Sequence, residues 1–368
     1  MTRSLAPLRF GVEADFAIGV EEELSLVDPA THALVHTGVD VLERMEVPEA
    51  TGSAHPDTYS ALVELASPVC ASATEAVATL AALRGRLRAA GGTAIGAGIH
   101  PNAAFGDVEH VPARRYRKIA SQLRGLVMRT PTCALHVHVG MPDPETAIVV
   151  SNGLRERLPL LQALAANSPF WHGQDSGLAT ARAQLFRGYP RAEIPRAFAD
   201  FADYEETVAA VVEAGDLPDY TFLWWDIRPH PHLGTVEVRA MDSQSALSSV
   251  AGLAALIHAL ARVEAERGAR AWAPREALME ASFTAARDGL DARLPHDGAL
   301  RPAREVARAA LEEARPFARE TGAGAALEEV ERILREGNGA DRQRAAHASG
   351  GMPALLDLLA RETATDYR

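Results

Sequence analysis

The sequence predicts an α+β fold, and two observations support this prediction. The first half of the chain holds short runs in which β-branched or apolar residues alternate with polar ones, separated by stretches with apolar residues at helical spacing. After Leu247 the spacing is helical almost throughout. We therefore expect a sheet built from the first half and helices concentrated at the C-terminal end of the domain.

The expected strands are short and end at turn residues. Residues 16–27 alternate as a half-buried strand does, and Asp28-Pro29 ends the run. Three further strands are expected over residues 93–99, 133–139 and 235–241.

The expected helices end at glycine or proline. Apolar residues repeat over 75–90, before Gly91-Gly92, and over 145–167, where Ser168-Pro169 breaks the helix. Shorter helices are expected over 116–128 and 204–214. Residues 170–195 are rich in Gly, Pro and Arg and predict a long loop, which is uncommon in a compact domain unless the loop is functional.

Composition and charge exclude several classes of protein. The 368 residues carry 37 Lys and Arg against 49 Asp and Glu, a net charge of −12, whereas nucleic-acid binding needs clustered positive charge. No uncharged apolar run reaches the roughly 18 residues of a membrane span, and the N-terminus lacks the apolar core of a secretory signal. Length alone allows two domains or one large domain with an extension.

Two residue types give further expectations. Cys70 and Cys133 cannot form a disulfide framework, so we expect small core residues in a cytoplasmic protein. Lys118 is the only lysine, which leaves any binding of phosphate to arginine.

Three acids, Glu21, Glu22 and Glu23, lie inside the first expected strand. Because successive side chains of a strand point to opposite faces, Glu21 and Glu23 share one face and Glu22 takes the other. Two carboxylates about 7 Å apart repel each other unless a cation lies between them, and their oxygens suit Mg²⁺ or Mn²⁺. A solvated edge strand with a chance acidic run is the alternative.

His136 and His138 repeat this spacing in the strand expected over 133–139. A His-x-His pair on one face of a strand is either a metal-binding pair or two histidines that neighbouring groups satisfy. Beside carboxylates, an imidazole is an acceptable though not preferred ligand for Mg²⁺ or Mn²⁺.

The densest polar segment runs from Trp225 to Asp242. Glu237 and Arg239 share a strand face, so Glu237 could complete a metal site while the guanidinium of Arg239 suits phosphate oxygens. An ordinary cross-strand ion pair is the alternative. Arg228 lies in a proline-rich turn, where it could bind a carboxylate or simply be a surface residue.

Glu64 lies inside an apolar run and Asp57 precedes it. Burial of an unpaired carboxylate is costly, so Glu64 should have a cationic partner, whereas Asp57 could equally be a surface residue. The glycines of residues 96–101 lack the Rossmann and P-loop patterns and a lysine, which excludes those nucleotide sites. Together, the inward-facing acids, imidazoles and arginine suit Mg²⁺ ions held under a nucleotide triphosphate on the open face of a sheet.

On these motifs the chain resembles the carboxylate–amine ligase family called glutamate–cysteine ligase type 2, of the glutamine synthetase-like superfamily. The matching segments follow the family order from residue 16 to residue 344. They are Gly19-Val-Glu-Glu-Glu-Leu24, Val63-Glu-Leu-Ala-Ser-Pro-Val69, Gly98-Ile-His-Pro101, Leu135-His-Val-His-Val-Gly140, Ala166-Asn-Ser-Pro-Phe-Trp171, Trp225-Asp-Ile-Arg-Pro229, Gly234-Thr-Val-Glu-Val-Arg239, Ala286-Arg-Asp-Gly289 and Gly339-Ala-Asp-Arg-Gln343.

The resemblance implies a curved, mainly antiparallel sheet flanked by helices, whose concave face holds ATP and divalent metals. It implies that residues 1–368 form a single catalytic domain with a helical portion from about residue 247. It also implies ATP-dependent amide formation, in which a substrate carboxylate attacks the γ-phosphate and an amine then attacks the acyl phosphate.

Residue roles follow from the resemblance by position. Arg239 would contact the transferred phosphoryl group and act with Glu237 as the catalytic pair, while Asp57 is a further candidate ligand in a local sequence that departs from the family. The implied metal ligands are Glu21, Glu23, Glu64, His136 and Glu237, and the implied contacts to nucleotide or substrate carboxylate are Arg228, His138 and Arg287. The expected cofactors are ATP and Mg²⁺, which Mn²⁺ could replace.

Two departures from the family bear on the substrates: Ile99 replaces a threonine and Asn102 an aromatic residue. We expect glutamate as the activated acid, cysteine or another amine as the acceptor, and a homodimer from family habit. Residues 170–195 would shield the acyl phosphate from water as a lid. Two alternatives stay open at this point, a metal-dependent amide or γ-glutamyl hydrolase and a catalytically silent nucleotide-binding member.

Overall fold

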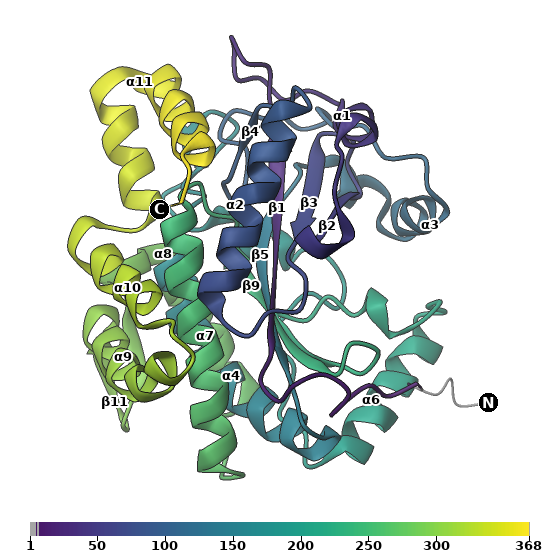
Figure 1. The fold of residues 1–368 in the computed structure, drawn as a ribbon, viewed down its shortest axis with the longest axis vertical. Helices are drawn as coiled ribbons and strands as arrows, with labels where there is room; N and C mark the ends of the chain where they lie inside the picture. The colour runs from purple at the N-terminus through teal and green to yellow at the C-terminus, as the bar shows by residue number, and fades with distance from the viewer. Residues whose placement is uncertain (1–4, 6, 368) are drawn as a thin grey trace.

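A seven-stranded sheet forms the centre of the computed structural model, which describes Leu5 and residues 7–367 (Figure 1). Its strand order is β2-β3-β1-β5-β9-β8, with β4 beside β1, and all the pairs are antiparallel. The strands are β1 (Ile18–Leu26), β2 (Ser53–Pro56), β3 (Leu62–Ala66), β4 (Ala94–Ile95), β5 (Ala134–Gly140), β8 (Ile227–His230) and β9 (Thr235–Asp242). The α+β fold and the antiparallel sheet are therefore confirmed.

Helices surround this sheet, and two small hairpins interrupt them. The helices are α1 (Gly38–Arg44), α2 (Ala73–Ala89), α3 (Arg114–Leu123), α4 (Pro144–Ala165), α5 (Ala181–Phe186), α6 (Phe201–Ala214), α7 (Leu247–Arg267), α8 (Arg275–Asp288), α9 (Ala303–Glu320), α10 (Gly324–Glu336) and α11 (Gly339–Ala364), with 3-10 turns at Glu49–Thr51, Arg124–Met128 (η2), Tyr220–Phe222 and Gly289–Asp291. The hairpins pair β6 (Phe170–Trp171) with β7 (Gln174–Asp175) and β10 (Arg293–His296) with β11 (Ala299–Pro302).

The two faces of the sheet differ because the side chains of β1 alternate. Ile18, Val20 and Leu24 are buried in the main core, which joins the sheet to α2, α4, α7, α9 and α10. The intervening residues, Glu21 and Glu23, point to the opposite face and are only partly buried. One face of the sheet is thus closed by helices, and the other is free to carry polar chemistry.

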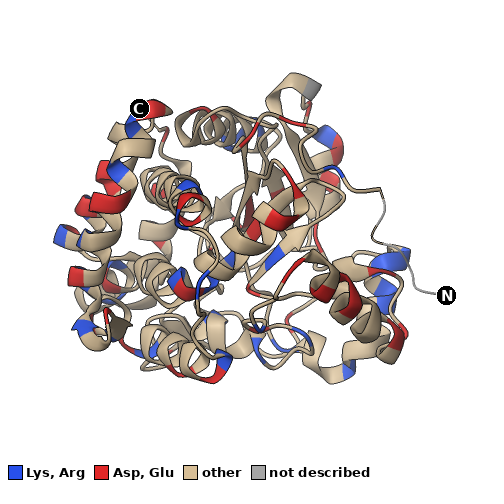
Figure 2. Cartoon of the chain, turned by 90° about the horizontal axis from the view of Figure 1, so that it is seen from below, with Lys and Arg blue, Asp and Glu red and all other residues tan. Residues whose placement is uncertain are grey.

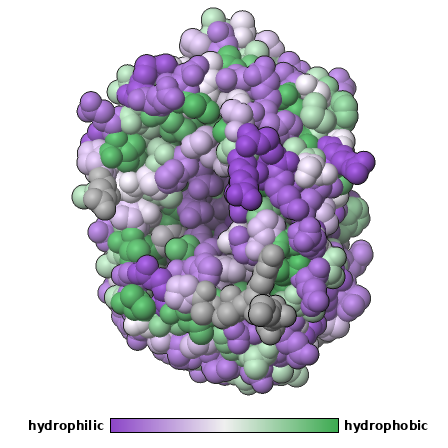
Figure 3. Space-filling model, turned by 90° about the vertical axis from the view of Figure 1, so that its right-hand side faces the viewer, coloured by the Kyte–Doolittle hydropathy of each residue, from purple (hydrophilic) through white to green (hydrophobic). Residues whose placement is uncertain are grey.

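Across the polar face lie α3 and α6, on the right in Figure 1. A second apolar cluster joins them, with Ile119 and Leu123 from α3, Tyr204 and Val208 from α6, and Trp225. Seen from this side, the molecular surface has a hollow with hydrophilic walls (Figure 3). The polar face of the sheet is therefore flanked by a second layer rather than sealed by one.

The C-terminal helices hold many of the surface charges. Acidic and basic segments are interspersed along them (Figure 2), with pairs such as Arg315–Glu328 and Arg332–Glu329. Exposed pairs of this kind add little stability. Helix α7 is long and apolar enough to cross a membrane, but 89% of that stretch is buried inside the fold, as expected for a core helix.

Helix starts follow ordinary capping chemistry. Ser72 accepts a hydrogen bond from the amide of Glu75 at the start of α2, and Asp143 does the same for Thr146 at the start of α4. At α11, Asn338 and Asp341 form a reciprocal capping box. The Gly339–Gln343 motif therefore has a structural task here, since the side chain of Gln343 also donates to Asn167.

Several sequence-based boundaries were wrong for identifiable reasons. The strand expected over 93–99 shrinks to Ala94–Ile95 because the chain then passes close to its neighbours: a Cβ at Gly98 would lie 2.5 Å from the carboxyl carbon of Asp242. Residues 170–195 are not an irregular loop but contain β6, β7 and α5. The β10–β11 hairpin interrupts the helical stretch expected after Leu247.

A buried ion pair fixes the sheet to α2. Glu22, on the helix-covered face of β1, accepts two hydrogen bonds from Arg84, at 2.8 and 2.6 Å. The same guanidinium donates to the backbone oxygens of Gln244, Ser245 and Thr363. Both side chains are at most 2% exposed, so this contact joins β1, α2, the segment after β9 and the end of α11.

Replacing Glu22 by Gln should leave Arg84 charged and unpaired in the core. Removal of one partner of a buried ion pair costs about 3–5 kcal/mol, so we expect the free energy of unfolding to fall by that order. Denaturant titration followed by circular dichroism measures the change. The exposed Glu43→Gln on α1 is the matched control and should shift stability by less than about 0.5 kcal/mol; equal losses in the two variants would contradict this role.

Candidate active site

Strand register brings the candidate residues together on the open face. Glu23 of β1 lies opposite Glu64 of β3, and Glu21 of β1 lies opposite His136 of β5. His138 of β5 lies opposite Glu237 of β9, which also faces Arg228 of β8. Four adjacent pairs of strands thus place the predicted acids, imidazoles and arginine side by side.

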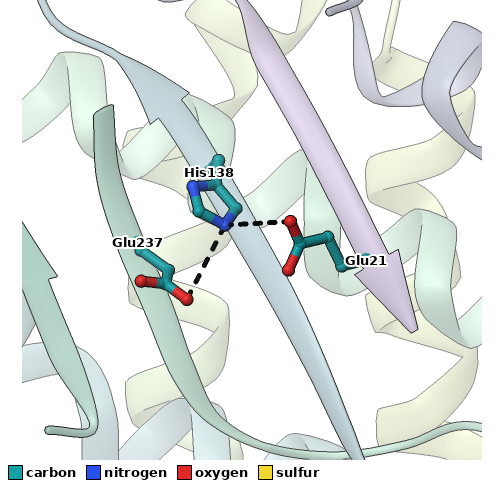
Figure 4. Close-up of side chains that lie close together, drawn as sticks. All are labelled: Glu21, His138 and Glu237. Carbon is teal, nitrogen blue, oxygen red and sulfur yellow. Dashed lines mark ion pairs between the residues drawn. The ribbon is translucent and has the colours of Figure 1, made fainter. Parts of the chain in front are cut away.

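Three of these side chains converge on one point (Figure 4). The Nε2 atom of His138 lies 3.5 Å from a carboxylate oxygen of Glu21 and 3.7 Å from one of Glu237. One potential ligand atom from each of the three groups lies within 4.8 Å of the other two. His138 Nδ1 is engaged with the hydroxyl of Thr235 at 3.0 Å, but its buried Nε2 has no hydrogen-bond partner. This arrangement fits a divalent cation.

His136 lies between the neighbouring acids. Its Nδ1 is 3.4 Å from Glu21, and its Nε2 is 3.9 Å from Glu23. Burial and the nearby charge of Arg239 lower the pKa of His136 to about 4, which keeps the ring neutral and able to act as a ligand. Burial also opposes the charged form of His138, but Glu21 and Glu237 outweigh it and raise the pKa of His138.

Glu237 is held between two arginines. Arg228 Nε donates to one of its oxygens at 2.6 Å, and Arg239 donates to the other. Although burial alone would raise the pKa of Glu237, the charges of Arg228 and Arg239 hold it well below its usual value. Glu237 is therefore an ionised carboxylate in the interior, only 2% exposed.

A bulge interrupts the alternation of β9 at Arg239 and Ala240. Between Leu135 and Val137 the register with β5 shifts, so that Arg239 and Ala240 together oppose His136. Arg239 keeps the face of Glu237 while Met241 returns to the main core. The buried Nε of Arg239 has no hydrogen-bond partner, which leaves this atom available to an anionic ligand.

Glu23, Glu64 and Asp57 form the acidic end of the site. The carboxylate of Glu23 accepts the amide of Ala134 at 2.7 Å. Burial, then the charge of Asp57, raise the pKa of Glu23 to about 8. Burial and the charges of Glu21 and Glu23 raise the pKa of Glu64 well above its usual value, and burial raises that of Asp57. These carboxylates are costly to ionise together unless cations neutralise them.

A cavity of about 110 Å³ opens beside this acidic end. Its walls include Arg182 and Tyr189, which the sequence analysis did not single out, and Asp57, which it left open as a surface residue. Arg182 is on α5, is 4% exposed and has an unpartnered buried Nε. Its position depends on the tertiary placement of α5, so no sequence pattern could have marked it.

Arg228 and Arg287 differ from their expected surroundings. Arg228 lies in β8 rather than in a turn, because proline is tolerated in an edge strand. Arg287 is in the last turn of α8, half exposed and paired with Asp288, and the structure does not bring it to the cluster around Glu237. Its role in binding nucleotide or substrate stays a prediction.

Two solved structures of ligases share this architecture. Glutamate–cysteine ligase from Francisella tularensis, in complex with AMP, matches with a TM-score of 0.73 and 14% identity over 96% of this chain and 89% of that chain. A bifunctional glutathione synthetase from Pasteurella multocida matches with a TM-score of 0.68 and 16% identity over 95% of this chain and 52% of that one. The chain thus shares the fold of these two ligases.

Sequence relatives give the family. Two proteins from Rubrobacter xylanophilus, named as candidate glutamate–cysteine ligases 2-1 and 2-3, are each 38% identical to this chain. The alignments cover 96% of both chains for the first, and 97% of this chain and 99% of the relative for the second. The model of glutamate–cysteine ligase family 2 matches residues 17–356, and the chain belongs to this family. It is an ATP-dependent carbon–nitrogen ligase.

The carboxylates predict a pH-dependent stability in the absence of divalent metal. Folding raises the pKa of Glu23 from 4.5 to about 8, and that of Glu64 in the same direction. The stability that the protonated groups contribute is complete below their unfolded pKa, and the part that Glu23 contributes is lost as the pH rises through about 8. In a chelator, the thermal midpoint should therefore fall over this range.

Addition of Mg²⁺ should reverse this loss, because the cation replaces the protons. The rise in thermal midpoint should be larger at pH 8 than at about pH 5, as scanning calorimetry can measure. Glu23→Gln removes one titrating group and should flatten the dependence. An equal effect of Mg²⁺ at both pH values would contradict metal binding by these acids.

Proposed function

We propose that this ligase activates glutamate with ATP and joins it to an amine, with Mg²⁺ or Mn²⁺ at the carboxylate face. The glutamate carboxylate attacks the γ-phosphate, which releases ADP and gives an acyl phosphate. The amine nitrogen then forms a bond to the acyl carbon, and inorganic phosphate and a proton leave. Membership of a ligase family gives no support to the hydrolase or to the silent nucleotide-binding alternative.

The main observation in favour of a bound divalent metal ion is the convergence of Glu21, His138 and Glu237. Two carboxylates and a buried unpartnered imidazole nitrogen within 4.8 Å of one another supply the donor types that Mg²⁺ and Mn²⁺ accept. Glu23 and Glu64, opposite each other on β1 and β3, are the ligands proposed for a further ion, with His136 between them and the first set. Bound metal would neutralise phosphate oxygens and polarise the γ-phosphoryl group.

The chain's own residues then have distinct tasks. Arg239 presents a fixed positive charge for the transferred phosphoryl group, because Glu237 holds one side of its guanidinium and leaves Nε unpartnered. Arg228 keeps Glu237 ionised and oriented. The segment 170–195 supplies α5, whose Phe186 lines the cavity, so it is the proposed shield that excludes water from the acyl phosphate.

Hydroxylamine trapping tests the activation of the acid without requiring the natural amine. With ATP and Mg²⁺, glutamate should give glutamyl hydroxamate and a matching amount of ADP, which coupled absorbance and mass spectrometry detect. Aspartate, one methylene shorter, is the matched acid control and should react at least about tenfold more slowly. Hydroxamate from neither acid would refute this function, and a preference for aspartate would refute glutamate as the acid.

Replacing Glu21 by Gln keeps the shape of the side chain but removes its charge. We expect ATP-dependent hydroxamate formation to fall at least about a hundredfold, because charge stabilisation in the transition state is lost. The thermal midpoint should change little, since Glu21 is partly exposed. Glu213→Gln, at an exposed position near the end of α6, is the control. Wild-type turnover by Glu21→Gln would remove Glu21 from the metal site.

A further inference from the structure

We propose that the basic surface of α3 is an electrostatic guide that speeds the association of Mg²⁺-bound ATP with the open face of the sheet. This inference rests on ATP as a substrate and on the proposed role of Arg239, and it concerns the rate of nucleotide capture. It is carried by a segment without acids, by the apolar face with which the same helix lines the site, and by a carbonyl that joins this surface to Arg228.

The segment that contains α3 is basic within an acidic chain. No Asp or Glu occurs from His110 to Pro142. The basic residues of this segment are Arg114, Arg115, Arg117, Lys118, Arg124 and Arg129. The rest of the chain is therefore still more acidic than the net charge of −12 suggests. Most of the molecule thus repels ATP, which stays anionic with Mg²⁺ bound, whereas this segment attracts it.

Acidic side chains neutralise little of this charge. Lys118 lies 3.6 Å from the exposed Asp216, and the carboxylate of Asp219 caps the 3-10 turn that follows it. Neither Arg114 nor Arg117 has an ion pair among the residues that the structure describes. On the C-terminal helices, by contrast, acidic and basic residues are interspersed (Figure 2). The surface of α3 therefore keeps an excess of positive charge.

Helix α3 presents its faces to different surroundings. Ile119 and Leu123, four residues apart, line the cavity beside the acidic end of the site. Arg114 and Lys118, also four residues apart, line a separate hollow of about 570 Å³. A helix with its side chains is about 10–12 Å thick, and the Debye length is about 10 Å at 0.1 M ionic strength. At low salt these charges therefore act on the site through space, without contact with a bound substrate.

Arg115 connects this surface to the site. Its guanidinium donates to the hydroxyl of Thr221 at 2.9 Å and to the backbone oxygen of the same residue at 3.4 Å. Arg228 donates to that backbone oxygen at 3.4 Å and to Glu237 at 2.6 Å, and Arg239 donates to the other oxygen of Glu237. Guanidinium groups thus extend from the surface of α3 to Arg239, which is proposed to contact the transferred phosphoryl group.

Stopped-flow fluorescence tests the proposal on the whole enzyme, with Mg²⁺ and ATP that carries an N-methylanthraniloyl group. The triple variant Arg114→Gln, Arg117→Gln and Lys118→Gln removes three charges outside the reacting site. We expect its association rate constant to fall at least about fivefold at low salt, because charges at the rim act on association. At about 0.5 M salt the difference should shrink to less than about twofold. The dissociation rate constant and the kcat for hydroxamate formation should stay unchanged.

Two control variants separate local charge from other effects. Arg301→Gln, Arg308→Gln and Arg319→Gln change the net charge by the same amount at exposed positions on β11 and α9. These elements lie on the opposite side of the molecule from α3 (Figure 1), so the association rate constant should stay within about twofold of wild type. Arg114→Lys with Arg117→Lys keeps the charge of α3 and should retain the wild-type rate.

The outcomes separate this inference from the function on which it rests. Wild-type association by the α3 triple variant at low salt, with its fold verified by circular dichroism, would overturn the guide alone. Equal losses in both triple variants would assign the effect to total charge, and a loss that persists at high salt would assign it to direct contact; either result overturns the guide. Absence of ATP-dependent hydroxamate formation would overturn the proposed function itself, and this inference with it.

Discussion

Three consecutive glutamates on one central strand impose the constraint on which the rest of the molecule depends. Strand geometry sends Glu22 into the helix-covered core and Glu21 and Glu23 to the open face. The carboxylates on each face need neutralising positive charge, and its source differs between the two faces. In the core, Arg84 supplies it permanently through two hydrogen bonds to Glu22. On the open face only part of the compensation is built in, which leaves room for cations and substrates.

The charges of the open face are graded across the sheet. At the β8–β9 edge, Arg228 and Arg239 keep Glu237 ionised, whereas at the β1–β3 side burial and mutual repulsion push Glu23 and Glu64 toward the protonated form. The site therefore combines a preformed ionic half with a half that gains most from an added cation. An overall charge of −12 does not reveal this gradient, because it arises from register rather than from composition.

Alternation along single strands made much of the site predictable. Glu21, His136 and Glu237 lie on a shared face because the two-residue period of a strand can be read from the sequence. The edge strand β8 was hidden by the proline within it, and α5, with six residues, is too short to show helical periodicity. Arg182 and the β9 bulge could not be predicted, since both depend on contacts between segments far apart in the chain. The family motifs supplied the residue roles, which spacing alone left open.

The contacts of Arg84 also bear on the order in which the molecule is completed during synthesis. One of its carbonyl partners belongs to Thr363, whose hydroxyl in addition accepts the amide of Gly96 beside β4. Arg84 leaves the ribosome 279 residues before this partner. The buried guanidinium therefore gains its full set of hydrogen bonds only after the residues of α11 have been made. The last turn of α11 therefore completes the contacts of Arg84 after the residues of the site have been synthesised.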